Sequence, residues 1–542
     1  MNLTFLGATH EVTGSYTLLE WLPGRFLLID YGMKQGEDEY INEPIPVKPS
    51  QIEYILLTHA HIDHSGNIPL LVKQGFRGTI YCTAETVNLC HIMLADSAHI
   101  QESEAMSQNK KNVRAGLPEI EPLYTKEDAE AAMNLFQACQ YNVIYQIDEG
   151  LQIRFIDIGH LLGSAAIECF LEESGVQKKI VFSGDVGNLN QPILNDPQFI
   201  QEADYLMIES TYGNRLHDEK ITDHRDAVRF LTDVLRRTFA RGGSVIIPSF
   251  AVGRTQELLY FFREIKQEDL LPEFRDFPVY VDSPMSNEAT AVFLQCDISC
   301  LDEDFRNIMQ QGVNPIWFDG LHTVTETEES KRLNDNKDIK VIISSGGMCE
   351  GGRIRHHLKH NLWDERNTVL FVGYQSNGTL GRILYDGAKS VKIYGETIEV
   401  KAEITLLHGV SGHADQKGLL RWISGFVTKP KYVFVNHGDD EACEALCAKI
   451  TADCKLPAMA PWSGSSFDLL KGEWIRLKEP VVRNKTKKSG ARIEKKQDKA
   501  SLLYNDLLDA AEQLLDAAKN MKGHSNQEIA QWTKKIREIM KE

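Results

Sequence analysis

Three histidines and one aspartate lie within six residues at the end of a predicted buried strand. The apolar run 52–57 predicts the strand, and the sequence THAHIDH follows it directly. An unpaired polar side chain in a protein interior costs about 1–3 kcal/mol, so these groups need strong partners. His59 and His61 point to the same side of an extended chain, whereas Asp63 and His64 fall in the following turn. The arrangement favours two adjacent metal ions over one, and a polar loop of unconnected histidines is the simpler alternative.

Further candidate ligands follow other predicted strands. Asp30 ends the run 26–29, where an aspartate is either a turn former or a group that orients a histidine. His160 follows the run 151–156, and Asp185 follows a strand that begins at Lys179. The resulting zinc-type inventory assigns His59, His61 and His160 to one ion, Asp63 and His64 to a second, and Asp185 as a bridge between them.

Two such ions imply a particular chemistry. Metal ions about 3.5–4 Å apart lower the pKa of a water between them toward ~7 and stabilise the charge of an in-line displacement at phosphorus. We therefore expect hydrolysis.

Composition limits the class of protein. The chain has 542 residues, of which 42% are hydrophobic and 25% charged, which is typical of a globular protein of about three or four domains. No apolar run approaches the ~20 residues of a membrane span, and no basic, apolar signal region opens the chain, so we expect a cytoplasmic protein without membrane contact. The ten scattered cysteines are typical of reduced thiols.

The net charge is −18, so any nucleic-acid contact needs a local groove of Lys, Arg and backbone N–H groups.

A second series of strands follows Asp185. Each apolar run ends in a loop and leads into a helical pattern, which predicts a parallel sheet with its site at the carboxyl ends of the strands. The runs are 244–250, 279–283, 340–345 and 369–373, and they come after the run 205–209, which ends in Glu209.

The first part of this pattern resembles the metallo-β-lactamase superfamily. The resemblance lies in HAHIDH, with Asp30 before it and His160 and Asp185 after it. It implies an αββα sandwich with the metal ions between the two sheets. Because this superfamily carries out many reactions, the fold alone does not identify the substrate.

The later residues resemble the β-CASP branch of that superfamily. The resemblance lies in Glu209, then His413 in SGHAD, then His437 in VNHGD, and it covers roughly residues 1–475. It implies that His437 is a further metal ligand, that His437 favours RNA over DNA, and that Asp63, Glu209 and His413 are catalytic. The implied ligands of two zinc ions are His59, His61, Asp63, His64, His160, Asp185 and His437.

His413 is the candidate proton donor to the leaving ribose oxygen, with Glu209 as its hydrogen-bond partner. A turn histidine with a purely structural role is the alternative.

A glycine-rich loop follows the run 340–345. It lacks Gly-Lys-Ser/Thr and is not a nucleotide P-loop, so it is either a tight turn before a helix or a phosphate contact made by backbone N–H groups. The candidate phosphate-binding residues are Arg254, Ser344, Gly347, Gly352 and Arg353.

Four segments are expected. Residues 1–210 begin the metallo-β-lactamase domain, 211–395 form the β-CASP insertion, 396–480 complete the first domain, and 481–542 form a basic linker and a helical tail. Apolar residues from Leu503 to Met521 recur at helical spacing, which predicts packing on the body or in a homodimer.

The preferred function is a dizinc ribonuclease with its site between the two domains. The alternatives are an RNA-binding scaffold with a vestigial site, and a dizinc hydrolase of small esters or thioesters. The sequence leaves open endonucleolytic or exonucleolytic action, the RNA preference, the physiological substrate, the oligomeric state and the role of the tail.

Overall fold

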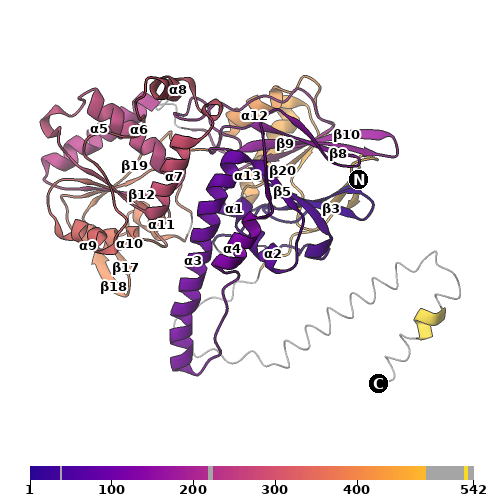
Figure 1. Cartoon of the computed structure of the whole chain (residues 1–542), viewed down its shortest axis with the longest axis horizontal. Helices are drawn as coiled ribbons and strands as arrows, with labels where there is room; N and C mark the ends of the chain where they lie inside the picture. Colours follow the sequence, from indigo (N-terminus) through magenta and orange to yellow (C-terminus); the bar gives the residue numbers. More distant parts are fainter. Residues whose placement is uncertain (37–39, 218–223, 377, 484–529, 535–542) are drawn as a thin grey trace. The chain divides into compact units, whose positions relative to one another are not determined.

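The computed structural model describes residues 1–36, 40–217, 224–376, 378–483 and 530–534. The chain divides into two compact units, residues 1–483 and residues 484–542. The predicted α/β class is confirmed, because two sheets share a core with helices outside them and a parallel sheet is inserted (Figure 1).

The first sheet has the order β23-β22-β1-β2-β3-β4-β5-β6. Its pairs are antiparallel from β23 to β3 and parallel from β3 to β6, so β3 and β4 end at the same edge. The strands are β1 (Asn2–Phe5), β2 (Thr17–Leu22), β3 (Arg25–Ile29), β4 (Ile52–Leu56), β5 (Thr79–Thr83), β6 (Phe136–Cys139), β22 (Ser466–Asp468) and β23 (Glu473–Arg476).

The second sheet has the order β21-β20-β11-β10-β9-β8-β7. Strands β10, β11, β20 and β21 run parallel, so their carboxyl ends meet at one edge. The strands are β7 (Ile144–Asp148), β8 (Leu151–Asp157), β9 (Ala165–Glu173), β10 (Val176–Phe182), β11 (Tyr205–Glu209), β20 (Tyr432–Asn436) and β21 (Ala458–Met459).

A buried apolar core joins the two sheets. Side chains alternate along each strand, so Leu27 and Ile29 of β3 face this core while Leu28 faces the helices outside. The second sheet contributes Phe155 and Phe434 to the same core. The outer helices are α1 (Ile62–Ser65), α2 (Ile68–Lys73), α3 (Ala84–Ala115), α4 (Lys126–Met133), α12 (Gln416–Ser424) and α13 (Asp440–Lys449).

The insertion is built on a six-stranded parallel sheet of order β14-β13-β15-β12-β16-β19. Its strands are β12 (Val245–Ser249), β13 (Val279–Asp282), β14 (Leu321–Thr323), β15 (Val341–Ser345), β16 (Thr368–Phe371) and β19 (Glu403–Leu406). Strand β19 pairs with β16, so the sheet continues past residue 395, where the sequence analysis ended the insertion. The sequence of β19 does not show which sheet the strand joins, because four residues carry too little pattern.

Helices cover both faces of this sheet. Neighbouring residues of one strand face opposite sides, so Val245 and Ile247 pack toward α5, α6 and α7, whereas Ile246 packs toward α10 and α11. The helices are α5 (His224–Ala240), α6 (Arg254–Gln267), α7 (Pro284–Gln295), α8 (Glu303–Gln310), α9 (Thr327–Asp335), α10 (Ile354–Asn361) and α11 (Leu380–Tyr385). A small hairpin of β17 (Ser390–Ile393) and β18 (Glu396–Glu399) follows α11.

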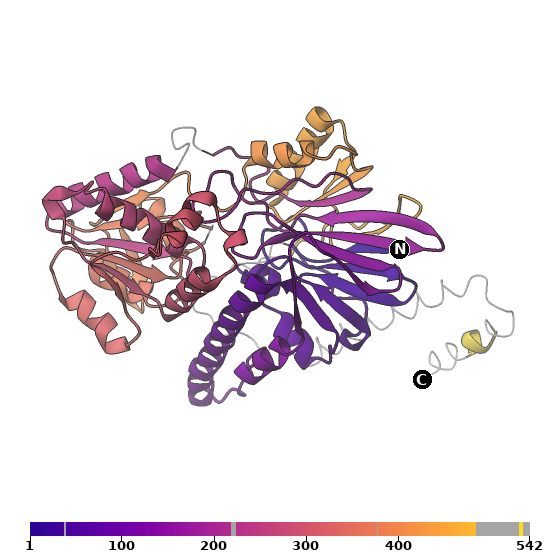
Figure 2. The same ribbon diagram turned by 45° about the horizontal axis from the view of Figure 1, so that its top comes forward.

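The insertion packs against the first domain through hydrogen bonds and a helix–helix contact. The backbone N–H of Ile193 donates to the Asp302 carboxylate at 2.8 Å, and Nδ2 of Asn195 donates to the carbonyl oxygen of Ser299 at 2.7 Å. Helices α3 and α7 also contact each other (Figure 2). A Cβ atom on Gly253 would lie 3.2 Å from Leu161, so the start of α6 touches the loop that carries His160.

The predicted apolar stripe from Leu503 to Met521 lies outside the described residues, as does most of the predicted linker. Among the described helices, none combines the length and apolarity that crossing a membrane requires.

Gly32 generates a test of how the fold supports the turn that carries Asp63. A Cβ atom on Gly32 would lie 1.6 Å from the carbonyl oxygen of Asp63. Overpacking of this kind costs about 1–3 kcal/mol or more, so we expect Gly32→Ala to lower the thermal midpoint of unfolding by several degrees. A Cβ atom on Gly351 meets no heavy atom within 4 Å, so Gly351→Ala is the matched control. Equal midpoints for the two variants would contradict this account.

Candidate metal centre

The candidate metal ligands follow the carboxyl ends of strands from both sheets. His59 follows β4, and His61 caps α1, whose single turn carries Asp63 and His64. Asp185 follows β10 and His437 follows β20, two strands of the parallel part of the second sheet. His160 lies in the loop between β8 and β9.

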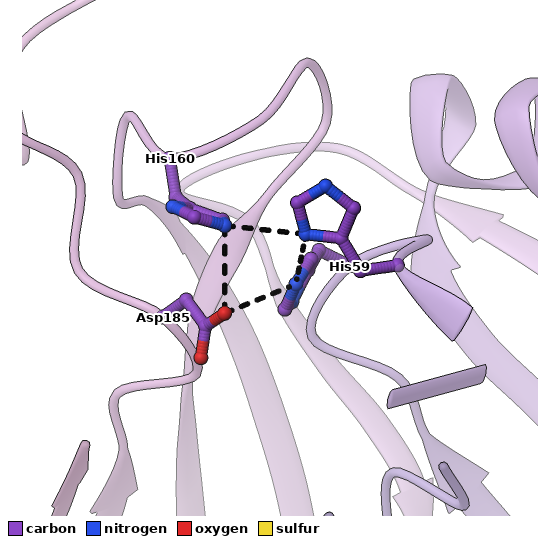
Figure 3. Close-up of side chains that lie close together, drawn as sticks. His59, His160 and Asp185 are labelled. Atoms are coloured by element: carbon purple, nitrogen blue, oxygen red, sulfur yellow. Dashed lines mark hydrogen bonds and ion pairs between the residues drawn. The ribbon is translucent and has the colours of Figure 1, made fainter. Parts of the chain in front are cut away.

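The first group of ligand atoms is formed by His59, His61, His160 and Asp185, all within 4.8 Å of one another. Nε2 of His59 lies 3.1 Å from Nδ1 of His61, and Nε2 of His160 lies 3.2 Å from the same atom. Oδ2 of Asp185 lies 3.5 Å from His59 and 3.4 Å from His160 (Figure 3).

The second group is formed by Asp63, His64 and His437. Nε2 of His64 lies 3.0 Å from Nε2 of His437, which lies 3.6 Å from Oδ2 of Asp63. Oδ1 of Asp185 lies 3.3 Å from His64 and 3.7 Å from His437. The two oxygens of Asp185 therefore face different groups, as a bridging carboxylate requires.

These donor atoms fit metal ions better than they fit one another. Nitrogens around a tetrahedral zinc ion with bonds of 2.0–2.1 Å lie ~3.4 Å apart, close to the separations seen here. Oδ1 of Asp185 is buried and accepts no hydrogen bond from the described residues. Burial lowers the pKa of His59, His61 and His160, and the neutral imidazole is the form that binds a metal.

His64 lies where a positive charge is favoured. Burial alone would lower its pKa, but the carboxylates of Asp185 and Asp30 raise it well above the usual value. A metal ion held by Nε2 of His64 would supply that positive charge without a proton.

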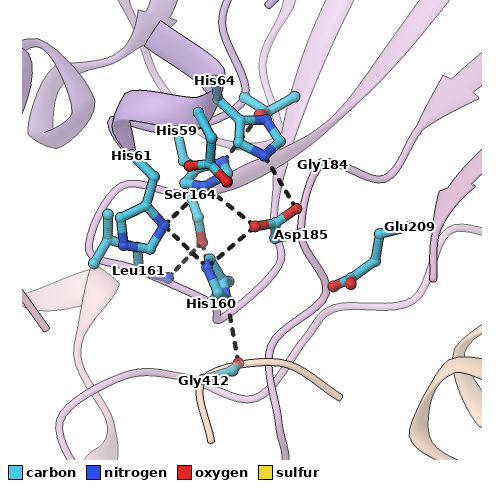
Figure 4. A network of polar contacts seen from close by, with 12 residues as sticks. His59, His61, His64, His160, Leu161, Ser164, Gly184, Asp185, Glu209 and Gly412 are labelled. Atoms are coloured by element: carbon cyan, nitrogen blue, oxygen red, sulfur yellow. Dashed lines mark hydrogen bonds and ion pairs between the residues drawn. The ribbon is translucent and has the colours of Figure 1, made fainter. Parts of the chain in front are cut away.

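Neighbouring groups fix the orientation of the imidazoles. Asp30 accepts from the backbone N–H of Thr58 at 2.8 Å and lies 2.8 Å from Nδ1 of His64, so Nε2 of His64 is left for a metal. The carbonyl oxygen of Gly412 lies 3.2 Å from Nδ1 of His160 and acts in the same way (Figure 4). Asp30 thus lies beside His64, and its role in orienting a metal ligand remains a prediction.

The sequence analysis did not single out three of the orienting groups. The hydroxyl of Thr58 lies 3.0 Å from Nδ1 of His59, and that of Thr211 lies 3.2 Å from Nδ1 of His437. The third is the carbonyl of Gly412. Their positions in the sequence could have indicated them, because each lies within two residues of a candidate site residue. Thr58 adjoins His59, Gly412 adjoins His413, and Thr211 lies two residues after Glu209.

Two residues of the centre have a backbone conformation that is rare outside glycine. The φ angles of Asp30 and His437 are 58° and 54°. Such strain costs about 1–3 kcal/mol and persists where surrounding contacts hold it. The backbone N–H of Asp30 donates to Leu56 and that of His437 donates to Ala8, which supplies such contacts.

His413 and Glu209 form a pair beside the metal ligands. Nδ1 of His413 lies 3.2 Å from Oε1 of Glu209, and the two rings of His413 and His160 have centroids 4.4 Å apart. The loop is held by the backbone of 186–188, because Ala414 N–H donates to Val186 and Asn188 N–H donates to Gly412. Burial alone would lower the pKa of His413, but the charge of Glu209 and its hydrogen bond raise it to about 9.

The two arginines predicted to bind phosphate have carboxylate partners within the insertion. Arg254, at the start of α6, pairs with Glu257, and both side chains are nearly buried. Nη1 of Arg353 lies 2.6 Å from Oδ1 of Asp282, and its Nη2 donates to the carbonyl oxygen of Thr325 at 2.6 Å. Contact of either guanidinium group with phosphate remains a prediction.

The other predicted phosphate contacts also have roles inside the insertion. The hydroxyl of Ser344 donates to the carbonyl oxygen of Asp282 at 3.0 Å. Gly352 has a φ of 77°, and a Cβ atom on Gly347 would lie 3.2 Å from the ring of Phe250. Phosphate binding by these residues likewise remains a prediction.

The orienting contact of Asp30 generates a test. In Asp30→Asn, an amide NH2 group replaces one of the two carboxylate oxygens. The side chain can then no longer accept hydrogen bonds from both the backbone N–H of Thr58 and Nδ1–H of His64. We expect about 10–100-fold weaker metal binding in chelator competition, with little change in secondary structure. Asp386→Asn, on an exposed turn, is the matched control. Equal metal affinity in the two variants would rule out this role.

Three family models match successive parts of the chain. The description "Metallo-beta-lactamase superfamily" matches residues 11–134, "Beta-Casp domain" matches 255–384, and "Zn-dependent metallo-hydrolase RNA specificity domain" matches 397–461.

Several curated relatives align along most of the chain. Ribonuclease TTHA0252 of Thermus thermophilus is 37% identical over 82% of this chain and 95% of its own length. An RNase J-like protein of Methanocaldococcus jannaschii is 31% identical over 85% and 98%, and the transcription termination factor FttA of Methanosarcina mazei is 32% identical over 85% and 70%. The chain therefore belongs to the β-CASP branch of the metallo-β-lactamase superfamily, and it is a metal-dependent hydrolase.

Proposed function

We propose that this protein is a dizinc ribonuclease that hydrolyses RNA phosphodiester bonds between its two domains. The observation that carries the proposal is Asp185, whose two oxygens face two separate groups of ligands. His59, His61 and His160 would hold one zinc ion, Asp63, His64 and His437 the other, and Asp185 both. Relatives named as a ribonuclease and as RNase J-like support RNA as the substrate.

Two zinc ions held there would supply positive charge and a water activated near neutral pH. Asp63 is the proposed acceptor of a hydrogen bond from that water. Burial alone would raise the pKa of Asp63, but the hydrogen bond with His437 and the neighbouring imidazoles lower it to about 2. A carboxylate of this kind orients a water and stays ionised while the bond at phosphorus breaks.

His413 is the proposed proton donor. A ribose oxygen leaves poorly unless it is protonated as the bond breaks, and a positioned acid commonly adds ~10²–10⁴-fold in rate. Since Glu209 raises the pKa of His413 to about 9, the imidazole carries a proton at neutral pH. Its side chain is 23% exposed, so it is within reach of a substrate.

Two alternative functions are less favoured. A scaffold with a vestigial metal site would not need a complete set of converging ligands. A hydrolase of small esters or thioesters would not need the inserted sheet. Labelled RNA and p-nitrophenyl phosphodiesters, tested with and without metal, separate these functions.

We also propose a cytoplasmic location and a homodimer. All ten cysteines are free, which is typical of a reducing compartment. Sedimentation of the full chain, compared with a chain that ends at residue 483, tests the homodimer.

The ligand assignment predicts the metal content. Protein purified without chelator should hold about two zinc ions per chain, and the double variant His59→Ala, His61→Ala should lose at least one. The exposed pair in His91→Ala, His99→Ala is the matched control and should keep both. Elemental analysis checks the content, and chelation should stop RNA cleavage until zinc is restored. If the variant His59→Ala, His61→Ala kept its full zinc content, the assignment of these two histidines as metal ligands would be wrong.

The proton assignment predicts a pH effect. His413→Ala should keep two zinc ions and RNA affinity while cleavage falls by ~10²–10⁴-fold. Glu209→Gln removes the charge that raises the pKa of His413, so the high-pH limb of kcat/KM should move to lower pH. Glu399→Gln, at an exposed glutamate, should leave the profile in place. Near-normal cleavage by zinc-loaded His413→Ala protein would remove His413 from the mechanism.

A further inference from the structure

We propose that Phe250 and Tyr374 form a ledge on which unpaired nucleobases stack beside the metal centre. This inference rests on the proposed ribonuclease function and adds a binding site to it. The ligand is the base face of a single-stranded RNA nucleotide close to the scissile phosphate. Neither residue belongs to the metal or proton-donor groups described above.

Both rings lie at the carboxyl ends of neighbouring strands and are exposed. Phe250 directly follows β12 and is 45% exposed, and Tyr374 lies just past β16 and is 41% exposed. Strands β12 and β16 pair in parallel, so both loops leave the sheet at the same edge. Open parallel sheets bind their ligands at this edge.

A series of ring–ring and arginine–ring contacts connects Tyr374 to the candidate metal ligands. The rings of His160 and His413 have centroids 4.4 Å apart, and those of His413 and Tyr212 are 6.0 Å apart. The guanidinium carbon of Arg215 lies 5.9 Å from the ring centroid of Tyr212 and 5.3 Å from that of Tyr374. Tyr374 is therefore three contacts away from the proposed proton donor.

Hydrogen bonds connect the loops that carry the ledge. Nε2 of Gln375 donates to the carbonyl oxygen of Gly347 at 3.0 Å and to that of Gly373 at 3.2 Å, which ties together the loops after β15 and β16. Cβ atoms built on Gly347 and Gly373 would lie 3.2 Å and 3.7 Å from the ring of Phe250. The two glycines thus leave room for the ring of Phe250 to lie close to the backbone, and the side chain remains exposed.

This chemistry fits unpaired RNA. Base-on-aromatic stacking is tolerant of sequence, because every base has a π face, and it contributes about 1–3 kcal/mol per base. A base in a duplex has both faces covered by its neighbours, so a stacking ledge selects single strands. Arg215, whose side chain is 40% exposed and lies 3.5 Å from Asp439, adds a cation beside the same ring.

The test is a double-mutant cycle between protein ring and RNA base. A short single-stranded RNA is prepared as the intact strand and as a series in which one nucleotide at a time, on either side of the mapped cleavage site, lacks its base. For the zinc-loaded wild type we expect loss of one or two particular bases to lower kcat/KM about 5- to 100-fold. Tyr374→Ala and Phe250→Ala should each show a similar loss on the intact strand, and removal of the same base should then cost them little more.

Two further variants serve as controls. Trp363 is 50% exposed and precedes β16, so it lies at the opposite edge of the sheet, and Trp363→Ala should keep the wild-type profile. Tyr374→Phe keeps the ring and should restore the penalty for the missing base. Zinc content and thermal unfolding establish that each variant is folded, and Tyr374→Leu and Phe250→Leu replace any alanine variant that is not.

The outcomes are distinct. The ledge does not exist if Tyr374→Ala and Phe250→Ala cleave the intact strand with the wild-type kcat/KM. It also does not exist if each missing base lowers kcat/KM by the same factor in these variants as in the wild type. If the zinc-loaded wild type cleaves no RNA, the proposed function fails and the ledge fails with it. If the wild type cleaves the intact strand, a failed cycle overturns the ledge alone.

Discussion

The buried carboxylate of Asp185 is the constraint on which the rest of the centre depends. An ionised carboxylate taken out of water carries a large free-energy cost unless positive charge or hydrogen bonds compensate it. Here Oδ1 accepts no hydrogen bond from the described residues, and imidazoles approach the carboxylate on two sides. The imidazoles of His59 and His160 are themselves held neutral by burial. On the side of His59 and His160 the charge of Asp185 therefore needs a cation that these imidazoles do not supply. On the side of His64, either a proton on that imidazole or a metal ion balances it, and strand ends of both sheets converge at this point.

The position of the insertion explains how one centre draws residues from such distant parts of the chain. The chain leaves the second sheet after β11 and returns to it at β20, and these two strands pair in parallel with Glu209 opposite Asn436. A large domain is thus added between neighbouring strands without breaking the sheet. The returning chain passes residues 186–188, where backbone hydrogen bonds fix Gly412 and His413 against the loop that follows Asp185.

The sequence predicted the parts of the site that depend on residue type and spacing. HAHIDH and the acids at strand ends predict a two-metal centre because few other structures require such groups together. The partner of a long side chain is not encoded in this way. Arg353 has a flexible stem, and only the fold shows that Asp282 and two backbone carbonyls receive its guanidinium group. The carbonyl of Gly412 is invisible to any motif, because every residue has one.

Glycine-rich loops are ambiguous in sequence for a related physical reason. A missing Cβ atom lets a phosphate approach the backbone, and it equally lets an aromatic ring lie on it. At Gly347 the structure shows the ring of Phe250 in that space. This bears on how an acidic chain of net charge −18 would bind RNA. Affinity that comes from neutralised phosphates falls steeply with salt, in proportion to the number of contacts, whereas stacking on a neutral ring adds affinity without adding to that slope. In an acidic protein, stacking on rings near the catalytic site therefore adds RNA affinity that does not depend on phosphate contacts. This affinity acts on strands that have already reached the site, and salt weakens it little.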